Sequence, residues 1–294
     1  MNKLKTIITG VDFSDCSRSA LEQAVRMAKW NNANLRMIHV IEDLVVSEAA
    51  EAMRMTLDQI RNQAREQAIG RLGLWARETG AEKNHSREVH MGSPLDGLLQ
   101  ECKTSKADLL VLGVTGDSLL PYGAGNLATK CLRKAPCKVM LVRPGHARPF
   151  RRIVACVDFS ETSREAVVQA LRVASQDQAE VHFLHVFTGS WGRYLLVPDA
   201  WEVDPQLATQ YRQALEQKLR DFVGNTGERQ VHFAVTEAGN HGHGIAEYAR
   251  RVDADLVVLG SKGRSNLTYV LLGSTVERLV REIPCSALVV KPPA

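Results

Sequence analysis

The 294-residue sequence lacks a long apolar run, has few aromatic residues and carries little net charge. A helix that spans a bilayer needs about 18 or more apolar residues, so we expect no membrane span. The apolar run at residues 6 to 11 is too short for a signal peptide and ends at Asp12, which predicts a cytoplasmic protein. With 5% aromatic residues and a net charge of +4, the sequence does not predict a nucleic-acid-binding surface.

Cysteine is scarce as well. The six cysteines include no Cys-x-x-Cys pair, which favours reduced thiols over a disulfide framework or a structural zinc site. Cys137 and Cys285 each follow a proline and are expected to be small buried residues. A Walker A sequence is also missing, which excludes an ordinary P-loop motor. Hydrophobic residues at 45% are nevertheless sufficient for two ordinary cores.

The chain is a duplication of a unit the size of a domain. The run Val-Asp-Phe-Ser at residues 11 to 14 recurs at residues 157 to 160, and residues 107 to 113 match residues 254 to 260. A repeat of about 145 residues is a whole domain and not a solenoid unit. We therefore predict two domains, residues 1–146 and 151–294, on either side of a stretch rich in proline and arginine.

Within each unit, β-branched apolar runs alternate with segments of helical period. Helical spacing of apolar residues is clear at residues 164 to 174 and 211 to 223. This alternation predicts an α/β fold, with two tandem doubly wound (Rossmann-like) domains that each have a five-stranded parallel sheet and about four helices. In the second unit we expect strands at residues 152 to 157, 180 to 186, 231 to 236, 255 to 260 and 286 to 290.

Two loops of the second unit would meet at the topological switch, where such sheets bind ligands. One begins with Asp158, and the other reads Gly260-Ser261-Lys262-Gly263, then nine residues, then Gly273-Ser274-Thr275. Glycines let backbone N–H groups surround an anion, and a hydroxyl at a helix N-terminus adds a donor, so the spacing is consistent with phosphate binding. Two structural readings remain open, because Ser274 and Glu277 also form a capping-box pattern and Gly260 could simply end a strand.

This pattern resembles the universal stress protein family, in its tandem form. Nucleotide-binding members carry glycine, two residues, glycine, nine residues, glycine, then serine or threonine, and residues 260 to 274 match this in full. The resemblance implies that ATP, with magnesium, binds the second domain, with Asp158 facing the adenosine and the Val186 backbone reading the adenine edge. It places Gly260, Gly263, Gly273 and Ser274 around the phosphates, with Lys262, Arg264 and Thr275 as weaker additions.

The resemblance also implies that domains pair through their last strands. Residues 138 to 142 would then lie against residues 286 to 290 as a pseudo-dimer within one chain, and a further homodimer is also open.

The first unit departs from the nucleotide motif. It reads Gly113, two residues, Gly116, only eight residues, then Gly125-Asn126, so its loop is one residue short. Asn126 replaces the hydroxyl, although it can still cap a helix, and Asp117 stands where the second unit has Arg264. We predict that this degenerate half binds ATP weakly or not at all.

Histidine provides weaker candidates. His241 and His243 have no nearby third ligand in sequence and are expected in a strand-to-helix loop, so we predict no metal site there and none elsewhere. His39 and His185 end the second strand of each unit, where a core or hydrogen-bonded histidine is more common than a catalytic base. We therefore assign no catalytic residue.

Two apolar segments remain. Residues 188 to 206 are too apolar for an idle loop and predict a lid, an apolar pocket or packing between domains. Residues 44 to 55 of the first unit are more typical of a helix that packs against its neighbour.

Our leading hypothesis is a stress-response binding module in which ATP regulates a surface or the arrangement of the domains. A slow ATPase is one alternative, although no water-activating base is evident. Another is an adaptor or carrier of an apolar, lipid-like ligand whose nucleotide motif is vestigial. A protein partner would fit the first and last of these, and the fold alone does not supply its identity.

Overall fold

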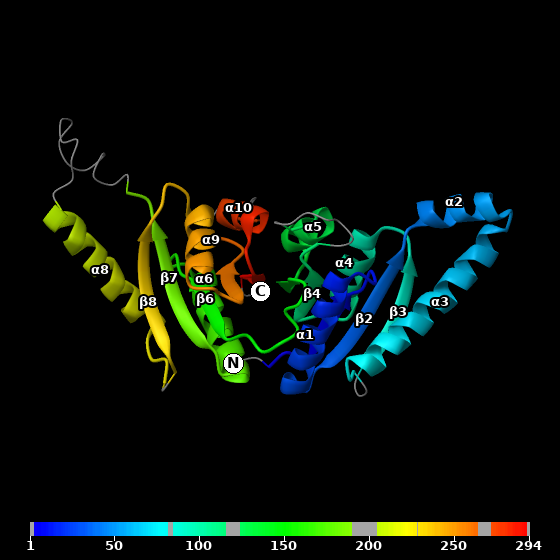
Figure 1. The fold of residues 1–294 in the computed structure, drawn as a ribbon, viewed down its shortest axis with the longest axis horizontal. Coiled ribbons are helices and arrows are strands. Elements are labelled where there is room, and N and C mark those ends of the chain that lie inside the picture. Colours follow the sequence, from blue (N-terminus) through cyan, green and yellow to red (C-terminus); the bar gives the residue numbers. More distant parts are fainter. Residues whose placement is uncertain are drawn as a thin grey trace. The chain divides into compact units, whose positions relative to one another are not determined.

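The computed structural model describes residues 3–81, 85–115, 124–189, 205–227, 229–263 and 272–292. The chain divides into two compact units, Met1–Arg148 and Pro149–Ala294. Each unit is a parallel sheet covered by helices, drawn as a ribbon in Figure 1. The predicted class, tandem doubly wound α/β domains, is confirmed.

The first unit contains a sheet of strand order β3-β2-β1-β4-β5, and all its neighbouring strands run parallel. Because β1 lies between β2 and β4, the order reverses there and creates the topological switch point. The strands are β1 (Thr6–Gly10), β2 (Asn34–Ile41), β3 (His85–Met91), β4 (Leu109–Gly113) and β5 (Lys138–Val142). The helices are α1 (Asp15–Asn31), α2 (Asp43–Met53), α3 (Leu57–Glu78), α4 (Pro94–Thr104) and α5 (Asn126–Lys134).

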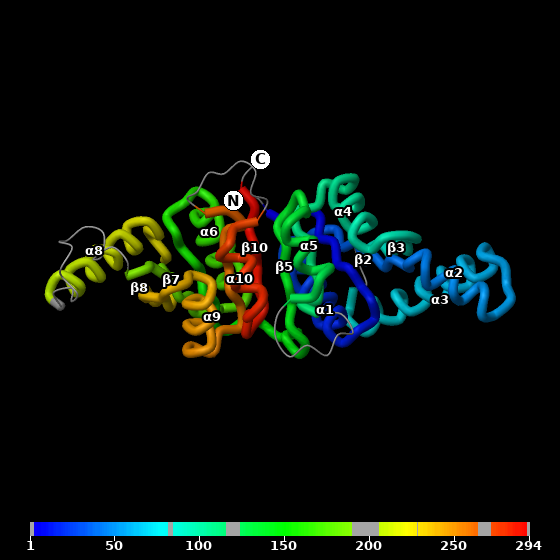
Figure 2. The backbone as a smooth tube through the Cα atoms, turned by 90° about the horizontal axis from the view of Figure 1, so that it is seen from above, coloured from blue at the N-terminus to red at the C-terminus, as the bar shows by residue number. Residues whose placement is uncertain are grey.

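The second unit repeats this plan with the order β8-β7-β6-β9-β10. Its strands are β6 (Arg152–Cys156), β7 (Glu180–Phe187), β8 (Val231–Glu237), β9 (Leu256–Gly260) and β10 (Ser286–Val290). All five agree with the predicted strands to within one residue at each end. Its described helices are α6 (Glu161–Asp177), α8 (Pro205–Val223), α9 (His241–Arg251) and α10 (Ser274–Glu282). Figure 2 shows α9 and α10 side by side from above.

The first unit has one helix more than the four predicted. Residues 44 to 55 do form a helix, α2, which packs on α3 through a small cluster of Val46, Ala50 and Ile60. The chain turns between the two helices because Arg54 adopts a left-handed conformation (φ 54°) and Thr56 starts α3 with a capping box. Val45 and Met53 are each 57% exposed, so α2 packs through only some of its apolar side chains.

Two further expectations, on the cysteines and on membrane spans, can be compared with the structure. The six cysteines form no disulfide bond, and the predicted burial of Cys137 and Cys285 is confirmed; the other four are buried as well. None of the helices in the described ranges is long and apolar enough to cross a membrane. The apolar segment at residues 188 to 206 lies almost entirely outside the described residues.

Candidate functional site

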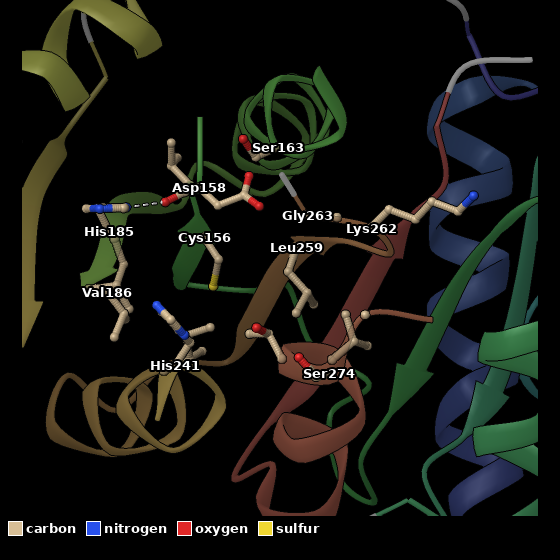
Figure 3. Close-up of a pocket in the computed structure, with 17 residues that line it drawn as sticks. Cys156, Asp158, Ser163, His185, Val186, His241, Leu259, Lys262, Gly263 and Ser274 are labelled. Atoms are coloured by element: carbon tan, nitrogen blue, oxygen red, sulfur yellow. Dashed lines mark hydrogen bonds between the residues drawn. The ribbon is translucent and has the colours of Figure 1, made fainter. Parts of the chain in front are cut away.

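A pocket of about 400 Å³ opens in the second unit at the carboxyl ends of β6, β7 and β9. This position is the topological switch of the sheet, since β6 lies between β7 and β9. Figure 3 shows Asp158 and Val186 on one side of the view and Lys262 on the other. The pocket brings together eight of the nine predicted site residues, Asp158, Val186, Gly260, Lys262, Gly263, Gly273, Ser274 and Thr275. The ninth, Arg264, lies outside the described residues.

A tight turn holds Asp158 at the pocket. Asp158 Oδ1 accepts hydrogen bonds from the Ser160 backbone N–H (3.0 Å) and hydroxyl (2.6 Å). Between them, Phe159 adopts a left-handed backbone conformation (φ 66°), which is unusual for a bulky residue. Ser160 then caps α6 by accepting from the Ser163 backbone N–H. Unusual backbone of this kind concentrates at functional sites, and here it fixes the position of a carboxylate.

The glycine-spaced loop approaches the same carboxylate. A Cβ placed on Gly263 would lie 2.8 Å from Asp158 Oδ2, so any larger residue there would have to displace the carboxylate. The other end of the loop is fixed by a hydrogen bond of 2.8 Å from the Gly273 backbone N–H to the Ser261 carbonyl. The described ends of the loop therefore lie beside Asp158 and at the start of α10.

The first turn of α10 faces the pocket. The N-cap residue is Gly273, with no side-chain capping bond, and Ser274 is the first helical residue. The capping-box reading of Ser274 and Glu277 is therefore wrong, because the helix starts one residue earlier than that motif requires. Gly260 does end β9, as the other structural reading expected. The exposed Ser274 hydroxyl stands at the positive end of the helix dipole, which favours anions.

His241 is a pocket residue that the sequence reasoning missed. We expected His241 and His243 in a loop, but both lie in the first turn of α9, capped by Asn240. The loop prediction is wrong because the Asn240 side chain accepts from the His243 backbone N–H and so starts the helix early. Asparagine before a glycine-rich helical turn was the only signal for this start. His243 instead contacts Glu282 at 2.8 Å.

Two further side chains form the walls of the pocket. His185 is buried, and its Nδ1 lies 2.7 Å from the Val157 carbonyl, which confirms the prediction of a hydrogen-bonded core histidine. Burial raises the pKa of the Cys156 thiol, so this residue is a neutral wall and not a nucleophile.

The first unit has a corresponding pocket of about 370 Å³. Asp12 binds Ser14 as Asp158 binds Ser160, and Phe13 has the same left-handed conformation (φ 65°). Asn126 is the first residue of α5, after Gly125 as N-cap, so the expectation that Asn126 could cap the helix is wrong. Five of the residues that line this pocket differ from the residues at the corresponding positions of the second unit. They are Glu42, Pro94, Thr115, Asn126 and Leu127.

The fold and the two pockets define a tandem repeat of a doubly wound α/β domain with a crevice at each topological switch. The model of the universal stress protein family matches residues 3–143 and 149–291. The chain therefore belongs to the universal stress protein family and carries two of its domains in tandem.

Individual relatives agree with this assignment. A universal stress protein of Methanocaldococcus jannaschii is 32% identical over 144 residues, which cover 49% of this chain and 84% of that protein. A universal stress protein E homolog of Haemophilus influenzae is 24% identical over 99% of this chain and 98% of its own length. A solved structure of a functionally unknown protein from Pseudomonas aeruginosa has a TM-score of 0.69 at 19% identity, covers 98% of this chain and 93% of its own, and supports the fold alone.

Proposed function

We propose that the second domain binds ATP, with magnesium, in the pocket between β6, β7 and β9, and that the bound nucleotide regulates a stress-response surface. The observation that carries this proposal is the convergence of eight motif residues on one pocket, although they are separated by up to 117 positions in sequence (158 to 275). Its volume of about 400 Å³ lies in the usual range for small-molecule sites.

The adenosine end of the proposed site is formed by Asp158 and Val186. Asp158 is half-buried, and its Oδ1 is fixed by Ser160, which leaves the carboxylate oriented to accept from a ribose hydroxyl. Val186 is buried at the carboxyl end of β7, where a backbone group can read the edge of a base. Cys156, Leu184 and Ile245 provide an apolar wall against which a base can pack.

The phosphate end is formed by Lys262, the first turn of α10 and the ends of the glycine loop. Lys262 supplies positive charge, and Ser274 and Thr275 bring hydroxyls to a helix N-terminus. Arg264 is proposed as a further phosphate contact from the sequence motif alone. The magnesium ion would be held mainly by the phosphates and water, which is its usual mode of binding to nucleotides.

Calorimetry with magnesium and ATP on the full chain tests this proposal. The structure offers a matched pair of variants, Asp158→Ala and Asp12→Ala, because both remove the same bonds to the following serine. We expect one site, weakened at least about tenfold by Asp158→Ala and unchanged by Asp12→Ala. Equal effects of the two variants, or two equivalent sites, would contradict a site confined to the second domain.

A slow ATPase is the second candidate, because His241 lines the pocket as an exposed imidazole that can take a proton from water. Timed release of ADP by wild type, Asp158→Ala and His241→Ala distinguishes it from a pure binder. Turnover that requires His241 would establish an enzyme. If millimolar ATP does not bind at all, the adaptor or apolar-ligand carrier becomes the better reading.

Four predictions about assembly, location and binding partners stand beside this proposal. Family membership supports pairing of residues 138 to 142 with residues 286 to 290 and is compatible with a further homodimer. Light scattering on the full chain measures the second of these. A cytoplasmic location and a protein partner are proposed from the sequence.

A further inference from the structure

A cluster of metal-binding side chains lies in the second unit at the amino ends of β7 and β8, the opposite end of the strands from the proposed nucleotide pocket. Glu180 and His182 share one face of β7, since side chains two residues apart point the same way. His232 on β8 is the direct register partner of His182, and their rings stack with centroids 4.5 Å apart. Strand pairing therefore brings together two histidines that are 50 positions apart in sequence.

The distances between the donor atoms suit a single ion. Glu180 Oε1 lies 3.6 Å from His182 Nε2, and Glu180 Oε2 lies 3.7 Å from His232 Nε2. All three residues offer a ligand atom within 4.8 Å of the others. Donor atoms bound to one Zn²⁺ at about 2.0–2.1 Å and tetrahedral angles are about 3.3 Å apart, so only small side-chain shifts are required.

His182 supplies a second, independent indication. Its side chain is about nine-tenths buried, and among the described residues its Nε2 has no hydrogen-bond partner. The other ring nitrogen, Nδ1, lies 2.9 Å from the Tyr248 hydroxyl, which fixes the orientation of the ring. A buried nitrogen without a partner is costly, and a ring held through its other nitrogen is the usual arrangement of a metal-binding histidine.

We propose that Glu180, His182 and His232 bind a divalent transition-metal ion of the Zn²⁺ type. Two imidazoles and one carboxylate are a ligand set that zinc takes with a water molecule in the fourth position. The His232 side chain is 47% exposed, so the ion can enter from solvent and keep a water ligand. The bound ion would tie β7 to the edge strand β8.

Arg152 has two opposite effects on metal binding at this site: it positions a ligand, and it adds a positive charge. Its Nε donates to Glu180 Oε1 and its Nη1 to the Val252 carbonyl, which holds the carboxylate in place and leaves Oε2 for the metal. Its positive charge opposes a second cation, so the affinity will be lower than for the same ligands without an arginine.

The first unit provides an internal control. Its cluster of Glu88, His90 and Glu101 also gathers donor atoms, but Arg36 stands at the repeat position of His182. Arg36 Nη2 lies 2.6 Å from Glu88 Oε1 and 2.8 Å from Glu101 Oε1, so the guanidinium already pairs with both carboxylates and places a positive charge among the donor atoms. We expect no zinc ion there.

Titration of Zn²⁺ into the metal-free full chain, without nucleotide, tests the proposal. We expect one site that saturates below about 100 µM, is lost in His232→Asn and is retained in His90→Asn and His243→Asn. His232 is exposed, so its replacement should leave the melting temperature of the metal-free protein unchanged. Zinc should raise the melting temperature of wild type and not of His232→Asn.

Co²⁺ in place of Zn²⁺ gives a spectroscopic readout, because a four-coordinate site absorbs visible light far more strongly than a six-coordinate one. The strong bands should appear in wild type and disappear in His232→Asn. The proposal is overturned if His232→Asn binds zinc as wild type does, if His90→Asn or His243→Asn removes the binding, or if wild type does not bind in this range.

Discussion

The pockets of the two domains share a scaffold and differ in charge. In both, the first strand of the sheet is followed by an aspartate, a phenylalanine with a left-handed backbone conformation and a serine that caps the next helix. The second pocket adds Lys262 and His241, whereas the first has Thr115 and Pro94 at those positions. The first pocket is also lined by Glu42, a second acidic residue in addition to Asp12.

This comparison shows that duplication retained the architecture while the electrostatics diverged. We expect a pocket with two carboxylates and no lysine among its described lining residues to repel a triphosphate more than a pocket with one carboxylate and one lysine. The start of the last helix changes in the same direction, since Ser274 and Thr275 correspond to Asn126 and Leu127. The turn after the first strand is therefore common to both units, and the two pockets differ in the residues that line them.

The largest loss of ATP affinity is expected from a substitution of Gly273 in the second pocket. A Cβ there would lie 3.3 Å from the Ser261 carbonyl and beside the first turn of α10, so Gly273→Val should weaken ATP binding by about a hundredfold. Gly125→Val is the matched control, because Gly125 makes the same bond to Val114 before α5. Calorimetry measures both, and comparable losses in the two variants would argue against the assignment.

The next effect tests the charge of Lys262. Lys262→Ala removes one cation from the proposed phosphate end and should weaken ATP by about tenfold while leaving adenosine unchanged. Competition assays with ATP and with adenosine measure the two affinities separately. A loss of adenosine binding as large as that of ATP would mean that Lys262 supports the pocket and does not contact phosphate.

A smaller change in ATP affinity is expected when residues of the second pocket are introduced into the first pocket. Thr115→Lys combined with Glu42→Thr removes the second acid and adds the cation, which should raise any ATP binding by that domain several-fold. The shorter loop is expected to limit the gain. The double variant is best titrated in an Asp158→Ala background, and no gain there would show that loop length outweighs charge.

The smallest effect is expected for the ion pair between His243 and Glu282 of the second unit, which has no identical counterpart in the first unit. The hydrogen bond to Glu282 raises the pKa of His243 above its ordinary value of 6.5, with a further contribution from Glu247. The repeat positions in the first unit are Asp96 and Lys134, where the order of the acidic and basic residues is reversed and no histidine is present. NMR titration should show the His243 pKa returning toward 6.5 in Glu282→Gln.

The sign of the stability effect follows from this shift. Because the folded-state pKa of His243 is raised, its contribution is fully present below about pH 6.5 and is lost as the pH rises through the folded-state value. Both groups are exposed, so the effect on melting temperature should be slight. A larger advantage of wild type over Glu282→Gln at pH 8 than at pH 6 would contradict this account.

Much of the fold and of the candidate site could be predicted from residue patterns. The five strands of the second unit were placed to within one residue because each is a short buried apolar run between polar turns. Asp158 and the loop glycines were found because their spacing repeats a known motif. Helix starts were less accurate, as at Ser274 and His241, because capping depends on local backbone geometry.

The duplication, the alternation of strands and helices, and the motif after β9 can all be recognised from the amino-acid sequence, because they are local or periodic properties of the chain. That His241 lines the second pocket and Glu42 the first became evident from the folded arrangement of the chain. The folded arrangement also determines that His182 faces His232, since that contact depends on the register between β7 and β8. Strand register is set by how the hydrophobic patterns of two strands match when they pair, so it depends on segments that are far apart in the sequence.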